Sequence, residues 1–232
     1  YQALIVLGLV LVCASSACRS ANNLPKKSSK EYNEAVRTFY VSLAALQVGD
    51  DVRADAKLAT LTQLVPEEPA GWGNWGVLAL RQRNYDVAAE RLEHARSLAS
   101  DNDQIQYLIG LLESSRGHSD QAIAALKKAL ELNDKNLVAT YKLAEETERL
   151  NTENSLAEFQ SLIQKLLDAQ PNNVAVLVEM GRIAAKRGDA QTLHVTVSKL
   201  AAQAANWPTE VQQQMSTVQT AANGSDPAAT AV

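Results

Sequence analysis

The stretch GWGNWG, residues 71–76, has the spacing G-x-G-x-x-G, which is the phosphate-binding turn of dinucleotide-dependent enzymes. That turn works only between a buried strand and the start of a helix, where main-chain N–H groups face the pyrophosphate. The preceding residues, QLVPEEPA (63–70), contain two prolines and two glutamates instead of an apolar strand. We therefore interpret the six residues as part of a helix and expect no nucleotide site there. This reading needs a reason for the glycines, because an interior glycine costs a helix about 1 kcal/mol relative to alanine.

Few other residues have the types and spacing that catalysis or metal binding requires. His94, His118 and His194 are far apart in the chain, and no C-x-x-C-H haem motif occurs. Cys13 and Cys18 are the only cysteines and both lie near the N-terminus, so the rest of the chain has no thiol chemistry. We predict that the protein is not an enzyme and uses no metal and no cofactor.

The composition favours helices and argues against nucleic-acid binding. The 232 residues are 46% hydrophobic and 5% aromatic, rich in alanine, leucine, glutamine and glutamate. Four of the 22 basic residues lie in residues 1–30, so the remaining 202 residues carry 18 bases against 26 acids, a net charge of −8. An acidic body repels the phosphate backbone of a nucleic acid.

The N-terminal segment has the character of an export signal. ALIVLGLVLVCASSAC, residues 3–18, is an apolar run that ends in small residues. Three interpretations stay open: a lipoprotein signal in which Cys18 is lipidated, an ordinary cleaved signal, and an uncleaved anchor. A basic region before the apolar run is missing, so we expect the reading frame to be incomplete. Residues 1–18 are the predicted signal and 19–30 a polar basic linker, whose lysines lie either on anionic lipid or in solvent.

The rest of the chain repeats itself with a period of 34 residues. Gly76 and Gly110 are 34 residues apart, and Ala144 follows after another 34; Gly181 follows after 37. The alanines Ala54, Ala88 and Ala122 show the same period. A period in this range is typical of stacked helical repeats.

These residues resemble the tetratricopeptide repeat (TPR) family, whose pattern is W-x2-L-G-x2-Y, then A-x3-F, then A and P. Trp72, Trp75 and Gly76, followed by Ala88 and Ala95, match it. The resemblance implies an all-α, right-handed α-solenoid of about five helix pairs with a C-terminal capping helix, over residues 31–222. The expected repeats are 35–68, 69–102, 103–136, 137–173 and 174–206, followed by a cap helix at 207–222 and a flexible tail at 223–232.

The TPR pattern also assigns structural roles within each repeat. Gly76 is the close-packing position, and Trp72 and Trp75 are expected in the core. Gly117 and Gly188 should end first helices, whereas Asp50, Asn84 and Asp189 should cap second helices. The extra residues of repeat 4, around RLNTENS (149–155), should lengthen its turn. Repeat 5 has Leu193 and Leu200 in place of alanine, so its helices should pack less closely.

In TPR proteins the first helix of each pair lines a concave groove, which the resemblance makes the candidate partner site. The groove residues that it implies are Phe39, Leu43, Leu46, Gly73, Asn74, Val77, Leu80, Arg81, Tyr107, Leu108, Leu111, Tyr141, Lys142, Glu145, Arg149 and Arg182. The N-terminal half of this set is apolar and the C-terminal half is charged. Alternatively, residues 31–34 or a neighbouring helix fill the groove internally. Chaperone-binding TPR proteins hold a carboxylate with lysine and asparagine where this chain has Phe39 and Leu43, so we expect no carboxylate clamp.

The expected function is a non-enzymatic scaffold, exported to the periplasm or anchored at the bacterial cell envelope, that binds a peptide or helix of a partner protein. The alternative is a docking module of a larger secreted protein or enzyme of which this sequence is a part. A third hypothesis, self-assembly end to end, is disfavoured by the glutamine-rich last helix.

Overall fold

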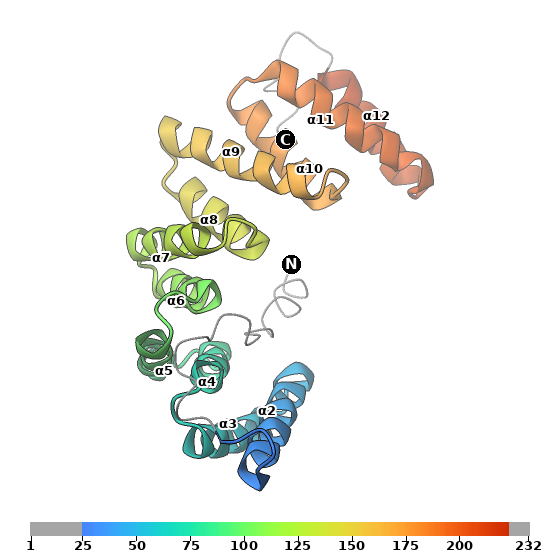
Figure 1. Ribbon diagram of the computed structural model, residues 1–232. Helices are drawn as coiled ribbons and strands as arrows, with labels where there is room; N and C mark the ends of the chain where they lie inside the picture. Colours follow the sequence, from blue (N-terminus) through green and yellow to red (C-terminus); the bar gives the residue numbers. More distant parts are fainter. Residues whose placement is uncertain (1–24, 223–232) are drawn as a thin grey trace. The chain divides into compact units, whose positions relative to one another are not determined.

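The computed structural model describes residues 25–222, in which eleven α-helices and one short 3-10 helix follow one another (Figure 1). The predicted signal with Cys18, residues 19–24 of the predicted linker and the predicted tail at 223–232 lie outside the described residues. The helices are α2 (Lys30–Val48), α3 (Asp51–Leu64), α4 (Pro69–Arg81), α5 (Tyr85–Leu98), α6 (Asp103–Arg116), α7 (Ser119–Leu132), α8 (Leu137–Arg149), α9 (Glu153–Ala169), α10 (Val174–Lys186), α11 (Ala190–Gln203) and α12 (Thr209–Ala222), with the 3-10 helix at Ala204–Asn206. The all-α class with helices packed in sequential pairs is confirmed.

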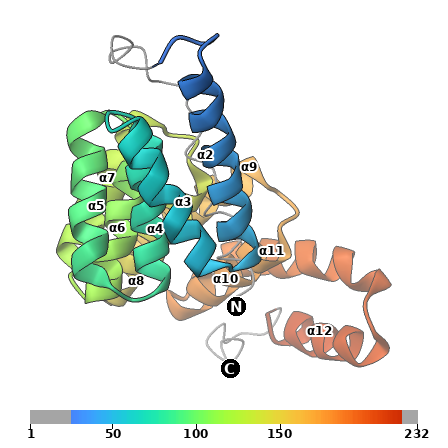
Figure 2. The same ribbon diagram turned by 90° about the horizontal axis from the view of Figure 1, so that it is seen from below.

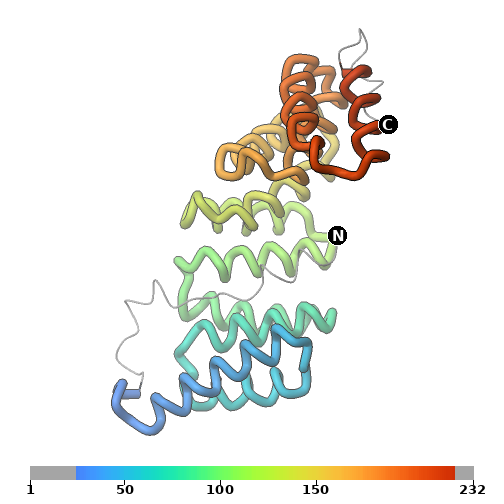
Figure 3. Tube along the Cα trace, turned by 90° about the vertical axis from the view of Figure 1, so that its right-hand side faces the viewer, coloured from blue at the N-terminus to red at the C-terminus, as the bar shows by residue number. Residues whose placement is uncertain are grey.

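The chain divides into two compact units. The first ends at Ala139 and the second begins at Thr140, so the division falls within α8. Each unit is built by antiparallel pairing of consecutive helices, which the trace in Figure 3 shows as successive hairpins.

The first unit contains two layers of helices. The first helices of the pairs, α2, α4 and α6, form one layer, and α3, α5 and α7 form the other (Figures 1 and 2). The second helices α3 and α5 also contact the first helix of the next pair, α4 and α6 respectively. This stacking buries the apolar faces that a single pair would leave exposed.

Glycines bring the two helices of a pair close together in the first unit. A Cβ built on Gly76 would lie 2.6 Å from Cγ of Leu92, and one on Gly110 would lie 2.6 Å from Cγ of Leu126. Both leucines are fully buried. The predicted role of Gly76 is therefore confirmed: these positions lack side chains because the partner helix occupies the space.

The helix ends follow the predicted capping. The side chains of Asp50, Asn84 and Asp189 accept hydrogen bonds from main-chain N–H groups in the first turns of α3, α5 and α11, at 3.1, 3.5 and 3.1 Å. Gly117 and Gly188 adopt the left-handed conformation, with φ of +82° and +68°. The N–H of Thr192 also lowers the pKa of Asp189, because it stabilises the carboxylate form.

Arginines at the ends of first helices tie each pair to the preceding one. Arg81 pairs with Asp51 and donates to the Leu46 carbonyl at 2.6 Å. Arg116 pairs with Asp86 and donates to the Tyr85 carbonyl, both at 3.0 Å. These contacts span about one repeat in sequence and fix the edge of the stack.

The extra residues of repeat 4 lie in a helix, so the predicted lengthening of the turn is wrong. Residues 150–152 form a turn no longer than that of 82–84 between α4 and α5. The helix α9 has 17 residues, whereas the other second helices have 14. Thr152 and Ser155 form a capping box at its start, and the helix-forming sequence that follows lets the helix absorb three more residues.

The second unit contains a helix pair that packs less closely, α10 and α11, and a capping helix, α12. A Cβ on Gly181 would meet its nearest neighbour, Cγ2 of Thr196, only at 3.7 Å, which confirms the predicted looser packing of α10 on α11. The cap helix α12 contacts α11, and Met215 packs against a cluster that includes Leu193 and Val197.

Candidate partner-binding surface

The predicted groove residues of the first unit lie on α2, α4 and α6, and we call their common side the first-helix face. On α4, Gly73, Val77 and Leu80 are four and three residues apart, which places them on one side of the helix. Phe39, Leu43, Leu80 and Leu111 remain partly exposed. The first-helix face therefore presents apolar side chains from all three helices.

Several predicted groove residues are buried. Leu46 packs in a cluster with Ala54, Leu58 and Leu78, so it belongs to the core and is not displayed. Val77, Tyr107 and Leu108 are each less than one-tenth exposed. The helix α4 contacts both α2 and α6, so a side chain on a first helix that points toward a neighbouring first helix packs against it and is buried. The repeat pattern places such residues on the right helix but does not show which of them face a neighbour.

Asn74 is the most unusual residue of the first-helix face. Its side chain is fully buried, and neither Oδ1 nor Nδ2 has a hydrogen-bond partner. Burial of an unpaired amide destabilises a protein by roughly 1–3 kcal/mol for each group left unpaired. Native structures contain few such groups, and each calls for an explanation. The preceding residue, Gly73, is also buried and adds no side chain.

Residues 31–34 do not fill the groove. They form the first turn of α2, and Glu31, Asn33 and Glu34 are exposed there. The interpretation that residues 31–34 fill the groove is therefore wrong, because α2 begins at Lys30, before the repeat boundary expected at residue 35.

Arg81 is engaged within the protein. Its guanidinium bonds to Asp51 and to the carbonyl of Leu46, as described above. It therefore joins two helix pairs, and its charge is already compensated.

The charged predicted groove residues of the second unit are also paired with neighbouring acids. Lys142 lies 3.1 Å from Glu145 and 3.2 Å from Glu146, which is fully buried and also binds Arg149 at 3.0 Å. These pairs leave little uncompensated charge on α8.

A second paired cluster joins α8 and α10. Arg182 binds both carboxylate oxygens of Glu148, at 2.6 and 2.8 Å, and also contacts Glu179 at 2.7 Å. The hydrogen bonds to Glu148 raise the pKa of Arg182 well above its ordinary value. The predicted charged groove of the second unit is thus a set of internal ion pairs, whereas Tyr141 is partly exposed.

The two tryptophans are only partly buried, contrary to the prediction that they lie in the core. The indole N–H of Trp72 donates to the Pro66 carbonyl at 2.7 Å, and that of Trp75 donates to Asp55 at 2.7 Å. The Arg91 guanidinium lies 3.8 Å from the centre of a Trp75 ring. Polar indole edges need partners, and here they find them at the surface.

GWGNWG lies inside α4, capped by Glu68, so it is not a phosphate-binding turn after a strand. Between residues 25 and 222, no group of three or more His, Cys, Asp or Glu side chains is placed to hold a metal ion. Within the same range, every helix is too short or too polar to span a membrane.

Comparison with known structures identifies the fold. One similar structure is that of pilF from Pseudomonas aeruginosa, with a TM-score of 0.68 and 16% identity over 88% of this chain and 90% of that one. Another is YrrB, described as a TPR protein with an unusual peptide-binding site, with a TM-score of 0.57 and 17% identity over 81% and 94% of the two chains. PilW, described as a type IV pilus biogenesis factor, gives 0.63 and 14% over 84% and 97%.

These similarities establish the tetratricopeptide repeat fold, and at such low identity they establish the fold alone. No known family model matches the sequence, and no curated protein matches it.

Two features of the surface were not predicted from the sequence. One is that the buried side-chain amide of Asn74 has no hydrogen-bond partner. Arg83, which adopts φ of +58°, stands where the repeat places glycine in other pairs. The 34-residue alignment of Arg83 with Gly49 and Gly117 was the available signal.

Proposed function

We propose that this protein is a non-enzymatic scaffold that binds an extended peptide segment of a partner protein on its first-helix face. The observation that carries the proposal is the buried, unpaired amide of Asn74 beside Gly73. A side-chain amide offers one acceptor and two donors, which matches the N–H and C=O of a peptide main chain. A carboxylate would satisfy only the donors, and the interior of a helix has no free main-chain groups.

Partner binding is also compatible with the burial of Asn74 in the free protein. Side chains around it must part before a peptide can reach it. This opening is favoured because the amide has no hydrogen bonds to lose and gains them from the peptide. The partly exposed Leu43, Leu80 and Leu111 supply the apolar contact area around that polar anchor.

Replacement of Asn74 by leucine tests the proposal. The substitution Asn74→Leu keeps the size of the side chain and removes the unpaired groups, so the free protein should become more stable by about 1–3 kcal/mol. The same change should weaken partner binding. The paired substitution Leu43→Asp with Leu80→Asp should abolish partner recovery while circular dichroism stays helical. A stable Asn74→Leu variant with unchanged partner recovery would remove the basis for this site.

We further propose that the protein is exported and held at the bacterial cell envelope. The apolar segment at residues 3–18 and its Cys18 support this placement. A labelled fatty acid should be incorporated into the full chain in bacteria and should be lost in Cys18→Ala. Release of the unlabelled chain into the soluble periplasmic fraction would instead support an ordinary cleaved signal.

The alternative is a docking module of a larger protein. One similar structure, the O-GlcNAc transferase of Thermobaculum terrenum, matches this chain over 61% of its length but over only 27% of the enzyme, with a TM-score of 0.57. Sequencing of the flanking DNA separates the two proposals: a frame that continues into a second domain supports the module.

A further inference from the structure

Each helix pair turns through one residue in the left-handed conformation. The residues at this turn position are Gly49, Arg83, Gly117, Asn151 and Gly188, with φ between +48° and +82°. Glycine adopts this conformation without a clash, and asparagine does so more readily than other residues. Arg83 is the one long side chain among the five turns of the described chain. A strained residue that persists is a reason to look for a role of its side chain.

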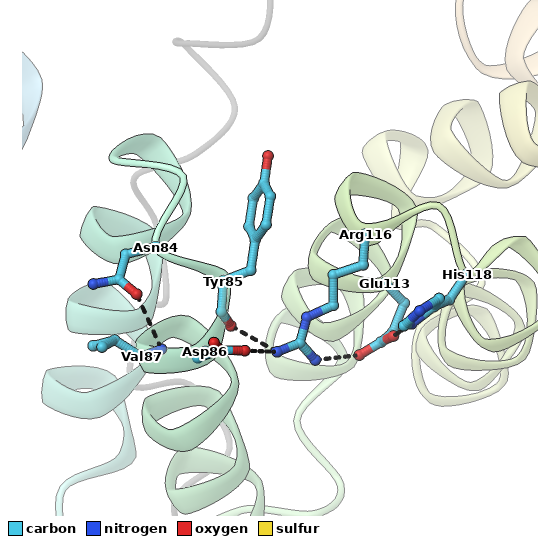
Figure 4. A network of polar contacts seen from close by, with 7 residues as sticks. All are labelled: Asn84, Tyr85, Asp86, Val87, Glu113, Arg116 and His118. Carbon is cyan, nitrogen blue, oxygen red and sulfur yellow. Dashed lines mark hydrogen bonds and ion pairs between the residues drawn. The ribbon is translucent and has the colours of Figure 1, made fainter.

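Arg83 lines an open hollow between two helix pairs of the first unit. The hollow is also lined by Tyr85 at the start of α5, by Ser115 and Arg116 at the end of α6, and by His118 before α7. Figure 4 shows the polar contacts among its neighbours, with the ring of Tyr85 pointing away from the ion pairs. The hollow therefore has side chains from α5, from α6 and from the turns that follow α4 and α6.

The other charges at this place are already paired. Arg116 lies between Asp86, at 3.0 Å, and Glu113, at 3.4 Å (Figure 4). Nδ1 of His118 lies 2.7 Å from the second carboxylate oxygen of Glu113. Because a carboxylate only accepts hydrogen bonds, this nitrogen carries the proton.

By contrast, the guanidinium of Arg83 forms no hydrogen bond or ion pair within residues 25–222. The hydroxyl of Tyr85, two residues away, has no partner in that range either. The hollow is thus lined by an unpaired guanidinium, that of Arg83, and by Tyr85, whose hydroxyl is available as a hydrogen-bond donor.

We propose that this hollow binds a carboxylate of an acidic segment of a protein partner, on a surface separate from the first-helix face. The planar fork of a guanidinium matches the two oxygens of a carboxylate or phosphate, and a phenol hydroxyl adds a third donor. The hollow is open, which suits a side chain of a partner lying across the turn better than a small ion that needs enclosure. Asp86 also lines the hollow, but its carboxylate is bound to Arg116 at 3.0 Å, so Arg83 is the lining charge that remains for a partner. The net charge of −8 on residues 31–232 repels a polyanion at long range, which favours a segment with a single acidic residue.

The test is a titration of the full chain with an acetylated, amidated peptide that carries a single aspartate among glycines and serines, followed by NMR of the arginine side-chain Nε–Hε groups. The peptide should shift the Arg83 signal, and Arg83→Gly should weaken binding about fivefold, the upper range for an exposed ion pair. Glycine occupies three of the equivalent turns, so this variant should fold. Arg83→Lys should bind with intermediate affinity. The matched control is Arg53→Ala, which removes another exposed arginine whose guanidinium has no partner and should leave binding unchanged.

A parallel titration with inorganic phosphate distinguishes the two oxyanions. Binding of the peptide with little effect of phosphate supports the proposal. A shift of Arg83 by phosphate but not by the peptide would overturn the assignment to a carboxylate. Equal loss of peptide binding in Arg83→Gly and Arg53→Ala would show attraction by net charge alone and would also overturn it.

Discussion

Three glycines at the same place in the repeat should respond in opposite ways to the same substitution. Gly76, Gly110 and Gly181 each stand where the first helix of a pair crosses the second. The alanine Cβ would lie 2.6 Å from a leucine Cγ at Gly76 and at Gly110, but 3.7 Å from Cγ2 of Thr196 at Gly181. The first two distances require movement of buried atoms, whereas the third is an ordinary contact.

The magnitudes follow from two opposing effects. An added methyl group in a packed core costs about 1–3 kcal/mol. Alanine in place of glycine stabilises a helix interior by about 1 kcal/mol. Because Leu92 is fully buried and its Cγ is not a mobile end, the upper part of the packing range applies at Gly76. We expect Gly76→Ala and Gly110→Ala to lose about 1–2 kcal/mol and Gly181→Ala to gain up to about 1 kcal/mol.

The assay is denaturant unfolding followed by two probes. Circular dichroism reports on the whole chain, and tryptophan fluorescence in a Trp207→Phe background reports on Trp72 and Trp75 in the first unit. A double-mutant cycle adds Leu92→Ala. Removal of Cγ and both Cδ atoms of Leu92 should relieve the clash, so that Gly76→Ala becomes neutral or stabilising in that background.

Equal changes at all three glycines would refute the reasoning, because the distances would then not decide the outcome. Failure of Leu92→Ala to relieve Gly76→Ala would also refute it, since the clash would then lie elsewhere.

Three further predictions concern charged residues. Arg83→Gly should raise the melting temperature, because it removes a left-handed non-glycine residue that costs about 1–2 kcal/mol; an unchanged or lower value by calorimetry would contradict this. The lowered pKa of Asp189 means that its stabilising effect is complete above the ordinary value of 3.8 and is lost as the pH falls through the folded-state pKa. Wild type should therefore exceed Asp189→Asn in stability at neutral pH by up to about 1 kcal/mol, and a difference that persists at pH values well below 3.8 would show that the carboxylate charge is not its source. Arg182→Met should destabilise the second unit by about 1 kcal/mol at low ionic strength, and a loss independent of salt would attribute the effect to packing instead of ion pairing.

The repeat period was sufficient to predict the helix pairs, their caps and the close approach at Gly76. These features depend on local spacing, and each requires a particular residue type at a fixed position. The placement of the three extra residues in repeat 4 was not predictable in this way. Both a longer turn and a longer helix preserve the spacing of later residues, and only the packing of α9 decides between them.

The candidate site was predicted less well than the fold. The pattern placed Leu46 and Arg81 on first helices, but Leu46 is buried against α3 and α4, and Arg81 is bound to Asp51 of the preceding pair. The pattern also did not show that the buried amide of Asn74 lacks hydrogen-bond partners. Sequence spacing reports which face a residue occupies, and it does not report which partners that residue finds.

The most direct test of the central proposal is site-specific photo-crosslinking in the bacterium. A photoreactive amino acid at Leu80 would report on the first-helix face, and one at the exposed Lys128 of α7 would report on the opposite layer. The proposal predicts a partner adduct of defined mass from position 80, absent from position 128 and lost in the Asn74→Leu variant. Adducts from position 128 alone, or adducts from position 80 that persist in Asn74→Leu, would contradict it.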